Sequence, residues 1–233
     1  MGRQSFEQQL QKLQEDVLVL GSMVENAITE AVAALKRRDL EASRRLVLAD
    51  REINEKRFAI EAECLTLIAT QQPLAGDLRT IAAVLEIATE LERIGDYAKG
   101  IARISLMIGT EPLVKPLIDI PRMAEKTRDM LHRALEAFIR RDAAAARAIP
   151  EEDSEIDALY NQVYRELLTY IIADPRTIDG ATHLLWAAHN LERTGDRVTN
   201  ICERVIFTVT GEMTELDVKE EDLRNPLTAD IRP

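Results

Sequence analysis

The stretch Leu-Glu-Arg-Ile-Gly-Asp at residues 91–96 returns, with one change, as Leu-Glu-Arg-Thr-Gly-Asp at residues 191–196. The spacing of 100 residues is close to half of the 233-residue chain. Repetition at such a distance is typical of two copies of one structural unit. Each copy also places a Glu and an Asp four residues apart, where like charges on a helix repel each other. This repeated repulsion indicates either common descent alone or a positively charged partner at both places.

The similarity between the halves extends beyond the repeated motif. Further matches lie at an offset of 103 residues: Arg38-Asp39 with Arg141-Asp142, Asp50 with Asp153, and Ile53 with Ile156. The smaller offset at the motif itself indicates that the loop near residues 71–80 is slightly longer than its counterpart. Almost the whole chain is therefore a tandem duplication.

Composition favours a helical protein that carries a negative charge. The chain is 46% hydrophobic but only 4% aromatic, whereas sheet proteins are rich in Val, Thr and aromatic residues. Its formal net charge of −11 disfavours binding to nucleic acid or to anionic lipid. We find no signal-peptide pattern and no run of about 18 apolar residues that would span a membrane. The sequence therefore predicts a cytoplasmic protein, with Cys64 and Cys202 as reduced core residues.

Prolines and capping residues divide the chain into about six helical stretches. The expected stretches are 6–38, 39–71, 77–111, 121–141, 142–174 with an interruption at Pro150, and 177–210 with Gly211 as C-cap. The economical fold is all-α, with two tandem antiparallel three-helix bundles related as an internal repeat. The expected domains are residues 1–112 and 113–212, followed by a polar tail at residues 213–233.

The repeated acids fall beside the apolar stripe of their helix. With about 100° of rotation per residue, Glu92 and Asp96 lie roughly 100–140° from Leu91, which belongs to the core stripe. Gly95 lies within the stripe and allows a neighbouring helix to approach closely. We therefore expect these carboxylates on the surface of the bundle, next to the core.

The second copy is richer in metal-ligand types than the first. His189, Glu192, Asp196, Asn200 and Glu203 share one band of their helix. The preceding helix of each half carries another polar pair at i, i+4, which is Asp50 with Asn54 in the first half and Asp153 with Asp157 in the second. If these helices pack side by side, the acids face one another across a groove. Such oxygen-rich sets suit hard cations, or iron and zinc where a His joins.

The motifs resemble those of the PhoU family. The resemblance rests on residues 91–102 and 190–201, and on the turn Gln-Gln-Pro-Leu-Ala-Gly-Asp-Leu-Arg at residues 71–79. It implies two tandem three-helix bundles in a cytoplasmic, commonly dimeric regulator that represses phosphate uptake and the phosphate-starvation response. The implied partners are the ATPase subunit of the phosphate ABC transporter and the phosphate-sensing histidine kinase.

The resemblance also implies carboxylate sites for iron, zinc or another divalent cation. Carried over to this sequence, the motif pairs are Glu92/Asp96, Glu192/Asp196 and Asp153/Asp157. The first half departs from the pattern at Asn54, which replaces an acid, and at Gly100, where the second half has Asn200. The first-half site is therefore poorer in ligands.

Two other function classes remain open at this point. A di-metal carboxylate enzyme on a helical bundle is the main alternative, but such enzymes use Glu-x-x-His motifs, which this sequence lacks. A purely structural helical scaffold is the other. We favour a non-enzymatic signalling adaptor without catalytic residues, in which a metal has a structural or sensing role.

Overall fold

The computed structural model describes residues 3–216, with side chains from residue 6 onward, and these residues are helical almost throughout. The helical elements are α1 (Arg3–Arg37), α2 (Leu40–Gln71), α3 (Ala75–Ile108), α4 (Asp119–Arg140), α5 (Ala143–Ala148), η1 (Ile149–Glu152), α6 (Asp153–Ala173), η2 (Pro175–Thr177) and α7 (Ile178–Thr210). The predicted all-α class and internal repeat are confirmed. α3 and α4 each begin two residues earlier than expected.

The same local chemistry starts the second helix of each half. Arg38 and Arg141 adopt left-handed backbone conformations, with φ of 56° and 54°. The aspartate that follows each arginine then caps the next helix. Asp39 accepts a hydrogen bond from the Ala42 N–H at 2.9 Å, and Asp142 accepts one from each of two N–H groups at 3.0 Å. The halves thus share their helix-start signals as well as their motif.

Pro150 explains why one expected helix is three elements. Proline lacks the N–H group that an α-helix interior requires. Here it lies in the short 3-10 segment η1, between α5 and α6. The expected interruption at Pro150 is confirmed, as is the expected helix end at Gly211, which has φ of 81°.

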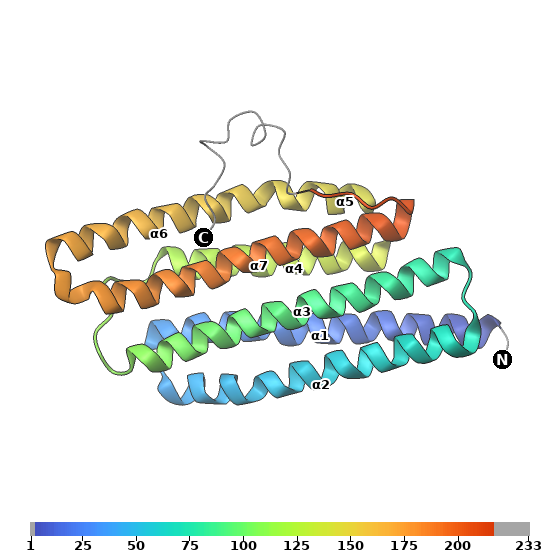
Figure 1. Cartoon of the computed structure of the whole chain (residues 1–233), viewed down its shortest axis with the longest axis horizontal. Coiled ribbons are helices and arrows are strands. Elements are labelled where there is room, and N and C mark those ends of the chain that lie inside the picture. The colour runs from blue at the N-terminus through green and yellow to red at the C-terminus, as the bar shows by residue number, and fades with distance from the viewer. Residues whose placement is uncertain (1–2, 217–233) are drawn as a thin grey trace.

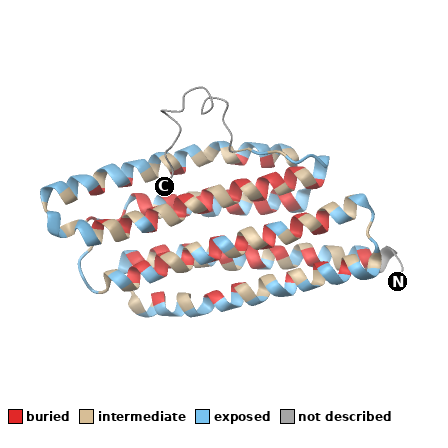
Figure 2. Ribbon diagram, viewed as in Figure 1, coloured by how far each residue is buried: buried red, intermediate tan, exposed pale blue. Residues whose placement is uncertain are grey.

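The long helices lie side by side in two bundles (Figure 1). α1, α2 and α3 form the first bundle, and α4, α6 and α7 form the second. α3 and α7 run antiparallel to each other, and their contact is the largest between any two described helices. α2 and α6 are the outermost helices, and few of their residues are buried (Figure 2). The two copies therefore meet through their motif-bearing helices.

α1 is apolar enough to resemble a membrane span by composition. Residues 6–37 contain a window of mean hydropathy 1.4, which the sequence reading based on uninterrupted apolar runs did not single out. Most of its apolar side chains repeat at helical spacing and are buried against other helices, as at Leu13, Leu20 and Ile28. Packing in the bundle core accounts for the apolar character of α1.

The chain turns back onto α7 after its last helix. The Leu216 N–H donates a hydrogen bond of 2.8 Å to Oε1 of Glu203, and the Leu216 side chain packs against the core. Residues 217–233, which make up most of the predicted polar tail, lie outside the described residues.

Candidate functional site

Glycine at the repeated motif brings the second helix of each half close to the third. A Cβ on Gly95 would lie 3.2 Å from two side-chain atoms of Ile53 on α2. A Cβ on Gly195 would lie 3.2 Å from Ile156 on α6 and would overlap the Asp153 carboxylate. The predicted close approach at Gly95 is confirmed. Each carboxylate motif therefore faces the helix that carries the other acidic pair.

Lys99 occupies the space between the first-half carboxylates. Its Nζ lies 2.6 Å from Oδ2 of Asp50 on α2 and 3.2 Å from Oδ1 of Asp96 on α3. Asn54 donates a further hydrogen bond of 3.1 Å to Oδ2 of Asp50. The hydrogen bond with Asp50 is the main cause that raises the pKa of Lys99. The ammonium thus ties α2 to α3.

Glu92 lies in the same region, but its pKa responds to cations other than Lys99. Partial burial raises the pKa of Glu92, and the nearby Asp96 and Asp50 carboxylates raise it further. The Arg57 guanidinium acts in the opposite direction. Three side chains with positive charge, Lys99, Arg57 and Arg93, therefore accompany the carboxylates of the first half.

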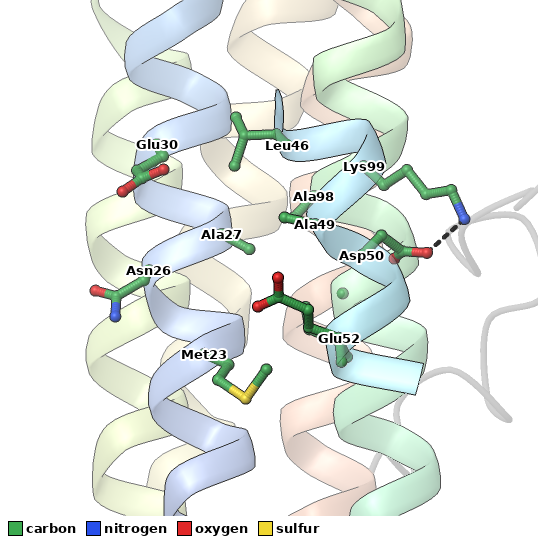
Figure 3. Close-up of a pocket in the computed structure, with 12 residues that line it drawn as sticks. Met23, Asn26, Ala27, Glu30, Leu46, Ala49, Asp50, Glu52, Ala98 and Lys99 are labelled. Atoms are coloured by element: carbon green, nitrogen blue, oxygen red, sulfur yellow. Dashed lines mark hydrogen bonds and ion pairs between the residues drawn. The ribbon is translucent and has the colours of Figure 1, made fainter. Parts of the chain in front are cut away.

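A cavity of about 190 Å³ adjoins this ion pair, between α1, α2 and α3. Asp50 and Lys99 stand joined at one side of it (Figure 3). Met23, Ala27 and Leu46 give it an apolar wall. The Asp50–Lys99 ion pair thus lies at the edge of a pocket with an apolar wall, which Asn26, Glu30 and Glu52 also line.

In the second half the acids gather around Gly195. Asp153, at the start of α6, places its carboxylate against Gly195. Glu192 and Asp196 lie within one turn of this glycine on α7. His189 Nδ1 lies 3.2 Å from Oε2 of Glu192. The α6 and α7 acids therefore lie close together, as the predicted pairing of helices requires.

The expected surface position is wrong for Glu192, one of the repeated acids, and Asp50 on α2, for which no exposure was predicted, is buried as well. Glu192 is only 8% exposed and Asp50 only 7%, whereas the Asp96 side chain is 49% exposed. The angle around one helix does not reveal which neighbouring helix covers that angle. α2 and α6 cover the side of the motif that faces them, and this burial makes the carboxylates more sensitive to nearby charge.

The structure gives different surroundings to three of the expected metal ligands, which are Asn200, His189 and Asp157. Asn200 donates a hydrogen bond of 3.3 Å to Glu90 in the first half. The ring of His189 lies 6.0 Å from that of Tyr160, and burial lowers the pKa of the imidazole. Asp157 is partly buried on α6, one turn after Asp153. Within residues 3–216 no three His, Cys, Asp or Glu side chains are arranged as ready metal ligands.

Sequence reasoning missed the role of Lys99. The signal was present, because the first motif continues as Asp-Tyr-Ala-Lys and the second as Asp-Arg-Val-Thr. A lysine three residues after Asp96 lies on the same helix face as that acid. Its reach to Asp50, 49 residues earlier, depends on how α2 packs on α3.

A polar seam joins the two halves where α3 crosses α7. Arg197 lies 3.5 Å from Glu90, and Arg204 lies 3.0 Å from Glu86. Arg193 makes a hydrogen bond with Tyr97 that raises the pKa of the guanidinium. The seam therefore places charged groups of one half beside the motif of the other.

Comparison with known proteins places both halves in one family. The family model described as PhoU domain matches residues 17–105 and again residues 120–205. The chain is 36% identical over 207 residues to the phosphate-specific transport system accessory protein PhoU of Edwardsiella tarda, which covers 89% of this chain and 85% of that protein. It is 35% identical over 207 residues to the protein of the same name from Escherichia coli strain K12, covering 89% and 86%.

Solved structures give the same result for the fold. The crystal structure of the phosphate transport system regulatory protein PhoU from Streptococcus pneumoniae superposes with a TM-score of 0.84 at 31% identity, covering 91% of this chain and all of that one. PhoU from Pseudomonas aeruginosa superposes with a TM-score of 0.84 at 34% identity, covering 89% of this chain and all of that one.

Proposed function

Because the chain belongs to the PhoU family, we propose that it is an accessory protein that regulates a phosphate-specific transport system. The observation that carries this proposal is the match of both halves to the PhoU domain, together with relatives named as accessory proteins of that system. In the proposed role the protein acts in the cytoplasm. It restrains phosphate uptake and the phosphate-starvation response when phosphate is plentiful.

The proposed partners are the ATPase subunit of the transporter, the phosphate-sensing histidine kinase and a second copy of the chain. Names of the relatives support association with transport components and describe accessory rather than catalytic proteins. The net charge of −11 favours partners with basic surfaces. We propose a non-enzymatic role, because the relatives are named as accessory or regulatory proteins of phosphate transport.

Deletion and capture test this role together. The gene is deleted, and phosphate uptake and phosphate-starvation gene expression are measured in high phosphate with and without the restored gene. We expect both to rise on deletion and to return on restoration. The tagged full-length chain should capture the transporter ATPase from the same cells. Unchanged uptake and expression after deletion would refute the regulatory role.

We also propose that the second-half carboxylates hold a divalent cation, with Asp153, Asp157, Glu192 and Asp196 as the oxygen donors and His189 beside them. The donor types suit iron, zinc or a harder divalent ion. Burial of Glu192 and the close approach of Asp153 to Gly195 favour a cation, since crowded carboxylates otherwise repel one another. When bound, the ion would supply positive charge between α6 and α7.

Metal removal tests this second proposal. A cation that binds only the folded chain raises stability by about 2.7 kcal/mol at 100 times its Kd. We expect the melting temperature to fall in EDTA and to recover with excess Mn²⁺. The double variant Asp153→Asn with Asp196→Asn should abolish the recovery. Asp179→Asn changes an exposed residue of α7, the helix that also carries Asp196. It is the matched control and should retain the recovery with Mn²⁺. Equal melting in EDTA and Mn²⁺ would refute the metal site.

A further inference from the structure

The two halves are equivalent at the motif in structure as well as in sequence. Gly95 packs against Ile53, and Gly195 packs against Ile156, which are the residues matched by the repeat. Asp50 and Asp153 both lie next to these contacts. The positions can therefore be compared one by one between the halves.

The comparison shows that the first half has two cations at positions where the second half has neutral side chains. Lys99 corresponds to Thr199 at the motif offset, and Arg57 corresponds to Tyr160 at the α2–α6 offset. Thr199 is buried, and Tyr160 lies beside the His189 ring. The difference falls on the residues that contact or neutralise the carboxylates of the first half.

The number of carboxylates, in contrast, is lower in the first half than in the second. The first half has Asn54 where the second half has the carboxylate of Asp157. Asn54 uses its amide to donate to Asp50, which already accepts a hydrogen bond from Lys99. An arginine stands at the same motif position in both halves, as Arg93 and Arg193, and Nη1 of Arg193 lies 3.7 Å from Oδ2 of Asp196. The first half thus differs in having fewer carboxylates and two additional cations, Lys99 and Arg57.

The position of the Lys99 ammonium also disfavours a metal ion in the first half. Lys99 Nζ contacts Asp50 and Asp96 at 2.6 and 3.2 Å, so it bridges the same oxygens that a metal shared by α2 and α3 would need. A divalent cation there would repel the ammonium at short range in a partly buried environment, where screening by water is weak. The first-half residues therefore do not fit a metal ion.

We propose that Lys99 is the built-in cation of the first half, so that a divalent ion binds this chain in its second half only. The inference deepens the metal part of the proposed function and rests on it for the second half. The first half instead joins α2 to α3 through a fixed ion pair, which needs no metal and does not respond to its supply. Lys99 is thus a residue that determines where metal binds.

The test isolates the first half. The Asp153→Asn with Asp196→Asn chain removes two second-half donors, and Mn²⁺ is the probe. Bound Mn²⁺ per chain is measured by equilibrium dialysis with elemental analysis, and melting is followed with and without Mn²⁺. We expect no bound Mn²⁺ when Lys99 is present. Adding Lys99→Thr, the residue of the second half, should give up to one bound Mn²⁺ and a melting temperature that rises with Mn²⁺.

Lys99→Arg is the matched control, because it keeps a cation between the carboxylates and should bind no Mn²⁺. A second measurement does not depend on metal uptake. In EDTA, Lys99→Thr should melt at a lower temperature than Lys99→Arg, since only the former exposes Asp50 and Asp96 to each other's charge. Circular dichroism establishes that each variant is folded.

The outcomes separate the two proposals. Mn²⁺ binding in the presence of Lys99 that disappears with Glu92→Gln and Asp96→Asn would overturn the inference. Equal Mn²⁺ binding and equal melting of Lys99→Thr and Lys99→Arg would also overturn it. If the unaltered chain binds no Mn²⁺, the metal part of the proposed function fails together with the second-half clause of the inference, while the comparison at Lys99 still decides whether Lys99 takes the place of a metal in the first half.

Discussion

At the scale of single residues, glycines set how closely the helices approach. Gly21 on α1 is buried, and a Cβ there would overlap Cδ1 of Leu135 on α4. Gly76, near the start of α3, has open space at the same point. The two positions separate the packing cost of an added methyl from its favourable effect on helix formation.

Gly21→Ala should therefore destabilise the protein, whereas Gly76→Ala should not. Overpacking a buried contact costs about 1–3 kcal/mol, because Leu135 must move within the core. Gly76→Ala should leave stability unchanged or raise it by less than about 1 kcal/mol. Urea denaturation of both variants gives the comparison. Equal stability of the two would show that α1 and α4 do not meet closely at Gly21.

The two cysteines are residues whose protonation depends on burial. Desolvation raises the pKa of the Cys64 and Cys202 thiols to about 12, and both side chains are fully buried. They are free thiols, as the sequence predicts. Since only the thiolate reacts readily, the folded protein keeps both in an unreactive form.

Stability should fall as the pH rises above about 9. The unfolded chain releases the thiol protons near its ordinary pKa, while the folded chain retains them up to about 12. Each fully buried thiol therefore lowers the free energy of unfolding by up to about 1.4 kcal/mol for every pH unit in this range. Urea midpoints between pH 8 and 10 measure the slope, and Cys202→Ala should reduce it. Rapid alkylation of both thiols in the native protein at pH 8 would contradict the assignment.

At the scale of elements, helix starts are encoded by short local signals. The left-handed arginine and the capping aspartate that follows occur before both α2 and α5. Such signals act within a few residues, so the sequence predicted them well. The expected starts of α3 and α4 differ from the observed ones by two residues, and at both starts the first turn has no side-chain cap.

Removing either cap should destabilise its helix by a similar amount. Asp39→Ala and Asp142→Ala each leave backbone N–H groups of the first turn without an acceptor. We expect a loss of about 1 kcal/mol in each case, measured by urea denaturation. Asn is nearly as good a cap as Asp, so Asp39→Asn and Asp142→Asn are the matched controls and should lose much less. Similar losses for Ala and Asn would indicate that charge, not capping, matters.

At the scale of the whole molecule, the seam between α3 and α7 joins the copies. Glu90 receives Arg197 and Asn200 from the other half, and its side chain is only 14% exposed. When one member of a partly buried ion pair is removed, the charge of the other member is left uncompensated and the fold loses stability. The seam therefore couples the motif helices of the two bundles.

Glu90→Ala should destabilise the protein far more than a Glu→Ala change on the surface. Loss of Glu90 leaves the partly buried Arg197 without this carboxylate, and we expect destabilisation of about 1–3 kcal/mol. Glu55→Ala removes the exposed partner of Arg51, and should cost less than about 0.5 kcal/mol. Differential scanning calorimetry compares them. A loss at Glu90 no larger than that at Glu55 would show that the seam does not stabilise the halves together.

The sequence by itself determined the duplication, the helical class, the capping residues, the interruption at Pro150 and the buried cysteines. These follow from repetition, periodicity and short-range chemistry, all of which can be followed along the chain. It also identified the helices that carry the carboxylates.

Only the tertiary structure decided the environment of those carboxylates. Burial of Glu192 and Asp50 depends on which helix covers the motif, and the turn of Asn200 toward Glu90 depends on the register of α3 against α7. The contact between Lys99 and Asp50 joins residues 49 positions apart. A helical pattern gives the angle of a side chain around its own axis, but packing of neighbouring helices determines its partners, its exposure and therefore its charge balance.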